Sequence, residues 1–436
     1  MDKVAVIGMG YVGIPVAAII ADSGISTIGI DIDEKKVDSL NLGDYPIEGS
    51  EPGMQELIEE VIGSGKLRCT TDYNLASDSD IWMICVQTPF DVEKMQPNLR
   101  ALSSSVKSVG SVMKKGCVVI IESTIPPGTM VGEVKEWLEG ESGLIAGVDF
   151  GLGHCPERVM PGKLIQNLTN YGRALGGIDE KTHQAMSHIY SHITSGKLTK
   201  VSLETAEVVK TFENTYRDAE IAIANDFAKY CDAVGVDFYE VRELVNSVES
   251  RNLHLPGGGV GGHCIPKDTW LLAHGSKGKY VPEFLIKSRE VNDSMPSYVL
   301  ELIRNGLNRM GVVINESVIG ILGLSYLEES DDVRNSPTIS LLDELKKLGC
   351  EIKVHDHYVD YCEGVPLEST LENAICGSDA LVIMVSHNLY RNLDLSEISE
   401  KMRTPLVIDA RNVFSKKDLD SSGINYFSIG RGNSFY

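Results

Sequence analysis

The stretch KVAVIGMGYVGIPVAAIIADSGISTIGID, residues 3–31, determines the fold of the first part of the chain. Its first apolar run, Val4 to Ile7, predicts a buried strand, and a glycine-rich turn and an apolar helix over 14–20 follow at once. A second apolar run over 27–30 ends at Asp31. Strand, glycine turn, helix and strand in this order predict a parallel, doubly wound α/β sheet.

The turn G-M-G-Y-V-G has the spacing of a dinucleotide-binding motif. Gly8 permits a tight turn, Gly10 lets the backbone approach a pyrophosphate, and Gly13 lets the helix pack closely on the strand. The helix N-terminus attracts the phosphates. Asp31 can accept hydrogen bonds from both ribose hydroxyls and repels a 2′-phosphate, which favours NAD over NADP. The alternative is a structural turn without a ligand. The candidate NAD-binding residues here are Gly8, Gly10, Tyr11, Val12, Gly13, Asp31 and Lys36.

The composition of the chain limits which partners we expect it to bind and where in the cell we expect it. The 436 residues include 62 acidic and 40 basic side chains, a formal net charge of −22, and such a field repels phosphate backbones and anionic lipid. No apolar run has the roughly 18 residues of a membrane span, and no signal peptide is evident. We expect a cytoplasmic protein that binds neither nucleic acid nor membranes. Nine scattered cysteines without C-x-x-C, and His188 and His192 without a third ligand, predict no metal site.

The pattern changes twice along the chain. Helical periodicity begins near residue 199. An apolar stripe along one predicted helix face consists of Val209, Phe212, Tyr216, Ala219, Ile223 and Phe227. Strand-like runs return after Asn315 as SVIGILGL, CEIKVHD, ALVIMVS and PLVIDA. We therefore predict an α/β fold with two Rossmann-like doubly wound domains joined by a helical region. The predicted boundaries are 1–195 for the NAD-binding domain, 196–305 for the helical region and 306–436 for the C-terminal α/β domain.

A cysteine within the glycine-rich stretch LPGGGVGGHCIPKD, residues 255–268, is a candidate nucleophile. The stretch is not a phosphate-binding Walker loop, because His263 and Cys264 occupy the positions that such a loop requires for G-K-[ST]. Neighbouring glycines leave Cys264 open to a substrate carbon, and Lys267 and the positive end of a following helix would favour its thiolate. The alternative is an inert buried thiol.

Polar residues on one predicted helix and after two predicted strands form a second group of candidates. Lys210, Asn214 and Arg217 project from one helical face, where a lysine and an amide can stabilise an oxyanion. A solvated helix edge is the alternative. Thr124 in ESTIPPGT and Glu157 in CPERVMPG follow strands and are candidates for positioning water and for proton transfer. Glu157 and Arg158 could instead form an ordinary surface ion pair.

Six motifs in order resemble those of the UDP-glucose/GDP-mannose dehydrogenase family. They are G-x-G-Y-V-G, V-x-T-P (Val86 to Pro89), S-T-I-P-P-G-T, C-P-E-R, K-x-x-x-N and G-G-H-C-I-P-K-D, and they span nearly the whole chain. CPERVMPG, ENTYRDAEIAIAND and PGGGVGGHCIPKD are most similar to the branch that oxidises UDP-N-acetylhexosamines, particularly UDP-N-acetyl-D-mannosamine. The resemblance implies a UDP-sugar substrate, a UDP-sugar-binding C-terminal domain, and a homodimer or higher homo-oligomer formed through the middle helices.

The resemblance also implies a reaction in which C6 of one sugar loses two hydrides in succession to NAD. The Cys264 thiolate would form a thiohemiacetal and then a thioester, which water would cleave. The resemblance implies catalytic roles for five further residues: oxyanion stabilisation by Lys210 and Asn214, proton movement at Asp268, a water held by Thr124, and base catalysis of hydrolysis by Glu157.

Binding residues are implied in the same way. Arg251 would reach the substrate of a neighbouring subunit, Arg334 would approach the cofactor, and Arg411 would contact the UDP part. The other implied cofactor contacts are Thr88, Thr124 and Lys267. The other implied substrate contacts are Glu157, Arg158, Val159, Lys210, Asn214, Arg217, His254, Gly261 and Tyr326. One residue departs from the family pattern: Leu327 stands where the family usually has a substrate-facing lysine.

Three other functions remain open from the sequence. UDP-glucose or UDP-N-acetylglucosamine could be the sugar that is oxidised, and Arg217 is our candidate for reading an acetamido group. A two-electron NAD enzyme of the hydroxyacid type would share the dinucleotide fold and a lysine–asparagine helix. A non-catalytic NAD-sensing protein would explain the leucine at position 327.

Overall fold

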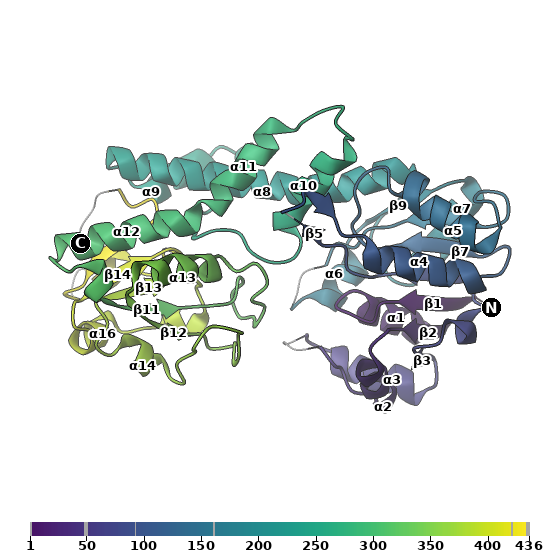
Figure 1. Ribbon diagram of the computed structural model, residues 1–436, viewed down its shortest axis with the longest axis horizontal. Coiled ribbons are helices and arrows are strands. Elements are labelled where there is room, and N and C mark those ends of the chain that lie inside the picture. The colour runs from purple at the N-terminus through teal and green to yellow at the C-terminus, as the bar shows by residue number, and fades with distance from the viewer. Residues whose placement is uncertain (1, 48–50, 92, 160–161, 420–421, 433–436) are drawn as a thin grey trace. The chain divides into compact units, whose positions relative to one another are not determined.

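The computed structural model describes residues 2–47, 51–91, 93–159, 162–419 and 422–432. They form two compact units, Met1–Glu213 with Trp270–Val281, and Asn214–Thr269 with Pro282–Tyr436 (Figure 1). We call them the first and the second unit. None of the helices among the described residues combines the length and the apolar character needed to cross a bilayer.

The first unit contains an eight-stranded sheet in the order β10-β9-β8-β7-β4-β1-β2-β3. Its strand pairs are parallel except β8 with β9. The strand order reverses between β1 and β4, and such a switch point is where open α/β sheets bind ligands. The strands are β1 (Lys3–Ile7), β2 (Ser26–Ile30), β3 (Leu67–Thr70), β4 (Ile81–Ile84), β7 (Val118–Ile121), β8 (Gly151–His154), β9 (Arg173–Gly177) and β10 (Leu198–Val201). A separate hairpin pairs β5 (Phe90–Asp91) with β6 (Gln96–Pro97).

Helices cover both faces of this sheet, as the continuous apolar strands predict. Val4 and Val6 pack into one core with α1, α3 and α7, whereas Ala5 and Ile7 pack into the other with α4 and α5. The alternation of side chains along a strand explains this division. The helices are α1 (Gly13–Asp22), α2 (Glu34–Leu42), α3 (Met54–Gly63), α4 (Arg100–Val112), α5 (Lys135–Ser142), α6 (Leu164–Asn170) and α7 (Glu180–Ser191).

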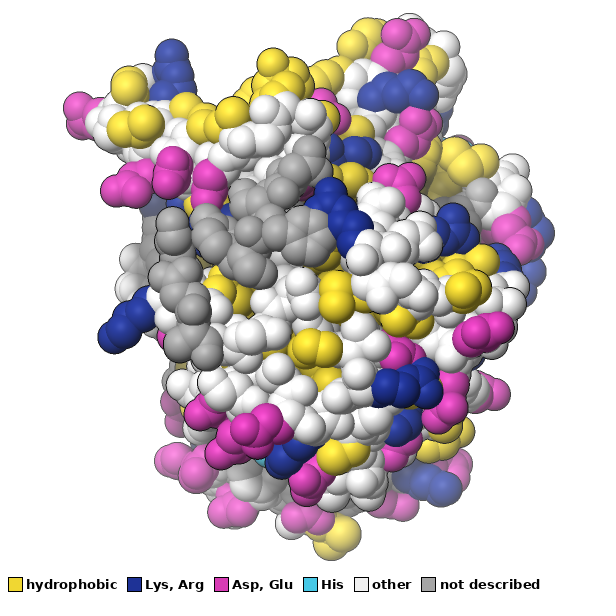
Figure 2. Space-filling model, turned by 90° about the vertical axis from the view of Figure 1, so that its left-hand side faces the viewer, with side chains coloured by type: hydrophobic (Ala, Val, Ile, Leu, Met, Phe, Trp, Pro, Cys, Tyr) yellow, Lys and Arg dark blue, Asp and Glu magenta, His cyan; other side chains and the backbone are white. Residues whose placement is uncertain are grey.

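The middle of the chain is helical, as the periodicity predicts. Its helices are α8 (Leu203–Val234), α9 (Phe238–Asn246), α10 (Ile265–Gly275), α11 (Glu283–Asp293) and α12 (Met295–Arg309). On α8 the alanines at 222, 224 and 228 are buried, while large apolar side chains of the predicted stripe are exposed, among them Phe212, Tyr216, Ile223 and Phe227. Figure 2 shows hydrophobic side chains along its upper edge, where α9 and the end of α8 lie in Figure 1.

The second unit contains the predicted C-terminal sheet, which is entirely parallel, in the order β12-β11-β13-β14-β15. Helices α12 and α13 cover one face, and α14 and α16 cover the other (Figure 1). The strands are β11 (Val318–Leu322), β12 (Glu351–His355), β13 (Ala380–Ile383), β14 (Leu406–Asp409) and β15 (Asn425–Ser428). The helices are α13 (Pro337–Leu348), α14 (Leu371–Ile375), α15 (Asn388–Arg391), α16 (Leu395–Lys401) and α17 (Lys416–Leu419).

Candidate functional site

The three glycines between β1 and α1 have the different surroundings that a dinucleotide turn needs. Gly8 has φ +88°, and a Cβ there would lie 2.9 Å from the Cys85 carbonyl oxygen. A Cβ on Gly13 would lie 1.9 Å from the Gly8 carbonyl oxygen, so helix and strand pack too closely for any side chain. Apart from its chain neighbours, no atom of the described residues would lie within 4 Å of a Cβ on Gly10. The backbone at Gly10 is therefore open to a pyrophosphate.

Asp31 directly follows β2, and its carboxylate accepts a hydrogen bond from the glycine-rich turn. Its Oδ2 accepts the Met9 N–H at 2.8 Å and lies 3.4 Å from Lys36 Nζ, and its Oδ1 accepts the Asp33 N–H at 3.0 Å. A carboxylate has about four acceptor positions, so ribose hydroxyls can still bind. Tyr11 and Val12 lie between Gly10 and Gly13. The open Gly10 backbone and this carboxylate fit a bound NAD.

Two threonines join the loops that follow β4 and β7. Thr88 Oγ1 donates to the Thr124 carbonyl oxygen at 2.5 Å, and both side chains are buried. Glu207 of α8 secures the same proline-rich loop by accepting the N–H groups of Gly128 and Met130 at 2.7 Å each. Thr124 is thus held at the carboxyl end of the sheet, where a hydroxyl can meet a ligand.

Glu157 pairs with Lys210 of α8, and the ion pair with its neighbour Arg158 that the sequence left open is not formed. Lys210 Nζ lies 3.5 Å from Glu157 Oε1, and the Val159 N–H donates to Glu157 Oε2 at 2.6 Å. Arg158 instead binds Glu213. Burial opposes ionisation of Glu157, but Lys210 and the Val159 N–H outweigh it, so the pKa of Glu157 is lowered. Residues 160–161 of this motif lie outside the described part of the chain.

Cys264 directly precedes α10, at the positive end of that helix. Its carbonyl oxygen accepts the N–H groups of Lys267 at 3.2 Å and Asp268 at 3.1 Å. The buried Asp268 carboxylate accepts from Lys267 Nζ at 2.6 Å and from Asn214 Nδ2 at 2.5 Å. The fold thus brings Asn214 of α8 and Asp268 of α10 together across 54 residues of chain.

The glycines before Cys264 are needed for close packing within the second unit. A Cβ on Gly261 would lie 2.5 Å from Tyr326 Cβ, and one on Gly262, which has φ +86°, would lie 2.8 Å from the Tyr326 ring. A Cβ on Gly257 would lie 3.0 Å from Arg411 Nη1. The sequence explained these glycines by access to the cysteine. The structure adds that the C-terminal domain approaches them too closely for side chains.

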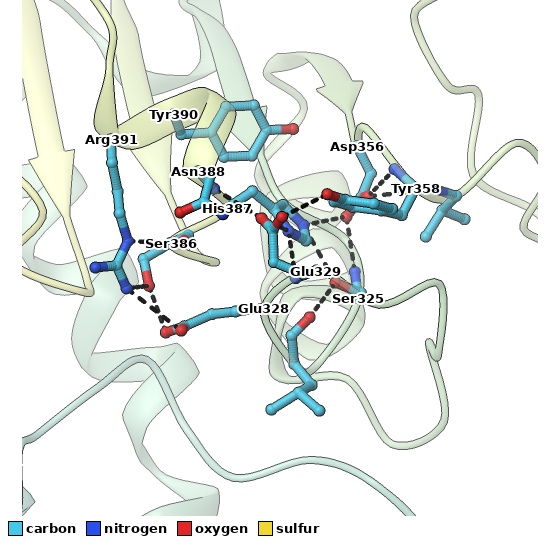
Figure 3. A network of polar contacts seen from close by, with 12 residues as sticks. Ser325, Glu328, Glu329, Asp356, Tyr358, Ser386, His387, Asn388, Tyr390 and Arg391 are labelled. Atoms are coloured by element: carbon cyan, nitrogen blue, oxygen red, sulfur yellow. Dashed lines mark hydrogen bonds and ion pairs between the residues drawn. The ribbon is translucent and has the colours of Figure 1, made fainter. Parts of the chain in front are cut away.

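The loop that carries Leu327 is held by a polar network at the carboxyl ends of β11, β12 and β13 (Figure 3). His387 Nε2 lies 3.3 Å from both Ser325 Oγ and Asp356 Oδ2, a grouping that resembles a hydrolase triad. However, the Glu329 N–H donates to His387 Nδ1 at 3.0 Å, which places the imidazole proton on Nε2. Such an imidazole cannot accept the serine proton. The network therefore clamps the loop.

Two arginines meet one carboxylate beside this network. Glu328 Oε1 accepts from Arg411 Nη2 at 2.9 Å, and Glu328 Oε2 lies 3.3 Å from Arg391 Nη2 (Figure 3 shows the Arg391 side). Arg334 binds Asp332 through Nε and Nη2, and its carbonyl oxygen accepts the Gly262 N–H at 2.8 Å. Cations thus gather near position 327, although the lysine itself is absent.

The remaining substrate candidates lie in the second unit. Arg217 Nη1 lies 3.3 Å from His254 Nε2, which is 3.0 Å from Glu220 Oε2. Arg251 is exposed, and its nearest described partner is Ser250 Oγ at 2.8 Å. Exposure leaves Arg251 able to contact another subunit.

Two histidines that could suggest a metal site, His188 and His355, contact other protein groups. His188 Nε2 lies 2.7 Å from Asp2 Oδ2, and His355 Nδ1 lies 2.9 Å from the Tyr390 hydroxyl. Within the described ranges, no group of three or more His, Cys, Asp or Glu side chains is arranged to hold a metal ion.

Our interpretation of the sequence missed a buried acid, Glu122. It follows β7, is 0% exposed, and accepts a hydrogen bond from the Tyr190 hydroxyl. A signal was present, because a glutamate directly after the apolar run VVII must either be paired or carry an altered pKa.

All three parts of the chain match domains of one family. Residues 2–194 match its NAD binding domain, residues 204–294 its central domain and residues 320–416 its UDP binding domain. The chain is 36% identical over 432 residues to UDP-N-acetyl-D-mannosamine dehydrogenase of Pyrococcus horikoshii, with 99% of this chain and 100% of that protein covered.

Solved structures of sugar-nucleotide dehydrogenases have the same fold as this chain. A structure of UDP-D-ManNAc dehydrogenase from Pyrococcus horikoshii has a TM-score of 0.93, with 99% of this chain and 100% of that chain covered. NDP-N-acetyl-D-galactosaminuronic acid dehydrogenase from Methanosarcina mazei is 37% identical, with a TM-score of 0.90 and coverage of 99% and 96%. The chain belongs to the UDP-glucose/GDP-mannose dehydrogenase family and is an NAD-dependent UDP-sugar dehydrogenase.

Proposed function

We propose that the chain oxidises the C6 hydroxyl of a UDP-N-acetylhexosamine to the carboxylate, by four electrons and through a covalent bond to Cys264. The observation that carries the proposal is the position of Cys264 at the N-terminus of α10, next to the Lys267–Asp268–Asn214 cluster. A two-electron alcohol dehydrogenase needs no such cysteine. Relatives named for UDP-N-acetyl-D-mannosamine favour that sugar.

The reaction has four steps, and NAD supplies the hydride acceptor for two of them. First, C6 loses a hydride and its hydroxyl loses a proton, which gives the aldehyde. Second, the Cys264 thiolate adds to C6, and the oxygen takes a proton. Third, this thiohemiacetal loses a hydride and a proton to give a thioester. Fourth, water adds, the C–S bond breaks, and the thiolate leaves. In sum, one alcohol, two NAD⁺ and one water give one carboxylate, two NADH and three protons.

Five residues of this chain would take part in these steps in addition to Cys264. Lys210 and Asn214 donate hydrogen bonds to oxygen as its negative charge develops. Asp268 orients Asn214 and takes part in proton movement at the thiol. Glu157 accepts the proton of the attacking water, because its lowered pKa keeps it ionised at neutral pH. Thr124 holds that water.

The number of NADH molecules formed per UDP-sugar tests the proposal. We expect two NADH for each UDP-N-acetyl-D-mannosamine consumed, without free aldehyde, because the covalent bond keeps the half-oxidised sugar on the enzyme. The measurement is NADH absorbance combined with chromatography of the nucleotide sugars. One NADH per sugar would indicate the two-electron alternative, and none with any UDP-sugar would indicate an NAD-sensing protein. UDP-glucose and UDP-N-acetylglucosamine, run in parallel, determine the preferred sugar by kcat/KM.

We also propose that α8 forms a homodimer interface. Tyr216, Phe227 and Tyr230 are 66%, 51% and 67% exposed on this helix, and exposed aromatic side chains gathered in this way are typical of interfaces.

We expect Phe227→Asp to weaken dimerisation by about 100-fold, because burying an unpaired carboxylate is costly. Sedimentation velocity measures the change. Tyr361→Asp, at a 79% exposed position of the same unit, should leave the dimer intact. A wild-type monomer, or a Phe227→Asp dimer as tight as wild type, would contradict the interface.

A further inference from the structure

Glu122 is a buried acid that the proposed reaction does not use. Tyr190 of α7 donates its hydroxyl to Glu122 Oε1. Glu122 Oε2 has no hydrogen-bond partner among the described residues, and the nearest cation is Arg173 Nη1 at 4.0 Å. Arg173, on β9, is itself buried, and its Nε is also without a partner there. Glu122 and Arg173 therefore interact chiefly through their charges.

Arg173 connects this acid with the proposed base. Its Nη1 donates to the Pro156 carbonyl oxygen at 3.4 Å, directly before Glu157. Glu157 in turn lies 3.5 Å from Lys210. The four side chains Glu122, Arg173, Glu157 and Lys210 are all buried in the first unit and alternate in sign. Among these buried charges, a change in the charge of Glu122 alters the electric field at the other three side chains, because little water screens the interactions between them.

We infer that Glu122 is a positioning residue that acts through Arg173 on the carboxylate of Glu157. The inference rests on the function proposed above. When Glu122 is ionised it balances Arg173, and Glu157 is the stronger base. When Glu122 is protonated, the unbalanced guanidinium attracts the negative charge of Glu157, which then accepts a proton less readily.

Glu122 can change its charge near neutral pH. Burial raises the pKa of Glu122 to about 7, although Arg173 and the Tyr190 hydrogen bond oppose this rise. Glu157 also raises the pKa of Glu122, but its own pKa is lowered, so it stays ionised near neutral pH. The remaining titratable groups facing Glu122 stay neutral, because burial raises the pKa of the Cys155 thiol to about 12 and moves those of Cys85 and Tyr190 well upward. Near neutral pH, Glu122 is thus the group facing Arg173 whose charge changes.

The pH profile of kcat tests the inference. We expect wild-type kcat to rise through a group titrating near pH 7. Glu122→Gln, a neutral mimic of the protonated acid, should lose that rise and remain at the low wild-type acid plateau, with both KM values changed less than about twofold. Glu136→Gln, at an exposed position of the same unit, should keep the wild-type profile. A Glu122→Gln profile that keeps the rise would overturn the inference, since a merely structural loss lowers kcat equally at every pH.

A second variant and a second measurement guard against misfolding. Tyr190→Phe removes a hydrogen bond that favours the Glu122 carboxylate, so the rise should move to higher pH. The infrared carbonyl band of a protonated carboxylic acid should titrate near pH 7 in wild type and at higher pH in Tyr190→Phe. An unmoved band would contradict the inference. This titration needs no substrate, so it distinguishes a wrong role for Glu122 from a wrong proposed function, in which wild type would make no NADH from any UDP-sugar.

Discussion

Cys264→Ser is expected to lower the rate of uronate formation by about 10³-fold or more. A serine hydroxyl is a far weaker nucleophile than a thiolate, so the half-oxidised sugar would no longer be held for the second hydride transfer. The α10 N-terminus, which favours an anion, would remain. NADH formed in a single turnover, with chromatography of the sugar products, measures the loss at each oxidation separately. We expect the first oxidation to survive at a measurable rate.

Cys350→Ser is the matched control. Cys350 lies in the same unit, and its Sγ–H donates to the Leu345 carbonyl oxygen at 3.4 Å, a bond that a hydroxyl can replace. Burial raises the pKa of the Cys350 thiol, so it is protonated and unreactive. Activity should stay within about twofold of wild type. Full uronate production by Cys264→Ser would refute the covalent mechanism.

Arg289→Leu is expected to lower the free energy of unfolding of the second unit by about 3–5 kcal/mol. Arg289 and Asp218 are almost completely buried, and Arg289 Nη1 donates to Asp218 Oδ1 at 2.6 Å. Asn292 and Thr269 also donate to Asp218, so this carboxylate joins α8, α10 and α11. Without the guanidinium, the carboxylate would remain buried and unpaired. Denaturant unfolding followed by circular dichroism measures the loss.

The control for this prediction lies on the same helix. Lys287 of α11 is exposed and pairs with exposed Glu290 at 2.6 Å, and such surface pairs contribute little. Lys287→Ala should therefore change the free energy of unfolding by no more than about 0.5 kcal/mol. Equal losses in both variants would show that removal of any charge from α11, rather than isolation of a buried carboxylate, destabilises the unit. A loss that falls as pH drops would further identify Asp218, because burial raises its pKa and protonation removes the unpaired charge.

Most of the fold could be predicted because its strands and helices repeat a local pattern. Apolar runs such as VAVI and LVIM are buried on both faces, as in any parallel sheet between helices. Four of the five strands of the C-terminal sheet follow from the same pattern, whereas β15 was not predicted. The predicted limits of α1 differ from those observed by one or two residues, since this helix extends from Gly13 to Asp22. The predicted start of the helical region near residue 199 was wrong, because residues 198–201 form β10 and α8 begins at Leu203. The stripe on α8 was also visible as periodicity, but periodicity alone does not tell a core face from an exposed one.

The partners of charged residues could not be predicted. Glu157 is adjacent in sequence to Arg158, yet it pairs with Lys210, and Arg158 pairs with Glu213. Adjacent residues point in different directions, and which charges meet depends on how distant segments pack. The same reason explains why Glu122 was overlooked, since its partners Tyr190 and Arg173 come from α7 and β9.

The sequence by itself determined the dinucleotide turn, because its three glycines, the strand before them and the helix after them are neighbours in the chain. The close approach of the Cys85 carbonyl oxygen to Gly8, in contrast, depends on tertiary packing. The sequence also predicted the alternation of strands and helices at both ends of the chain and singled out Cys264 as the candidate nucleophile, which stays a prediction. Only the tertiary structure decided that the glycines before Cys264 lie against Tyr326 and that Asp268 binds Asn214. These contacts join segments separated by more than 50 residues, and no local spacing encodes them.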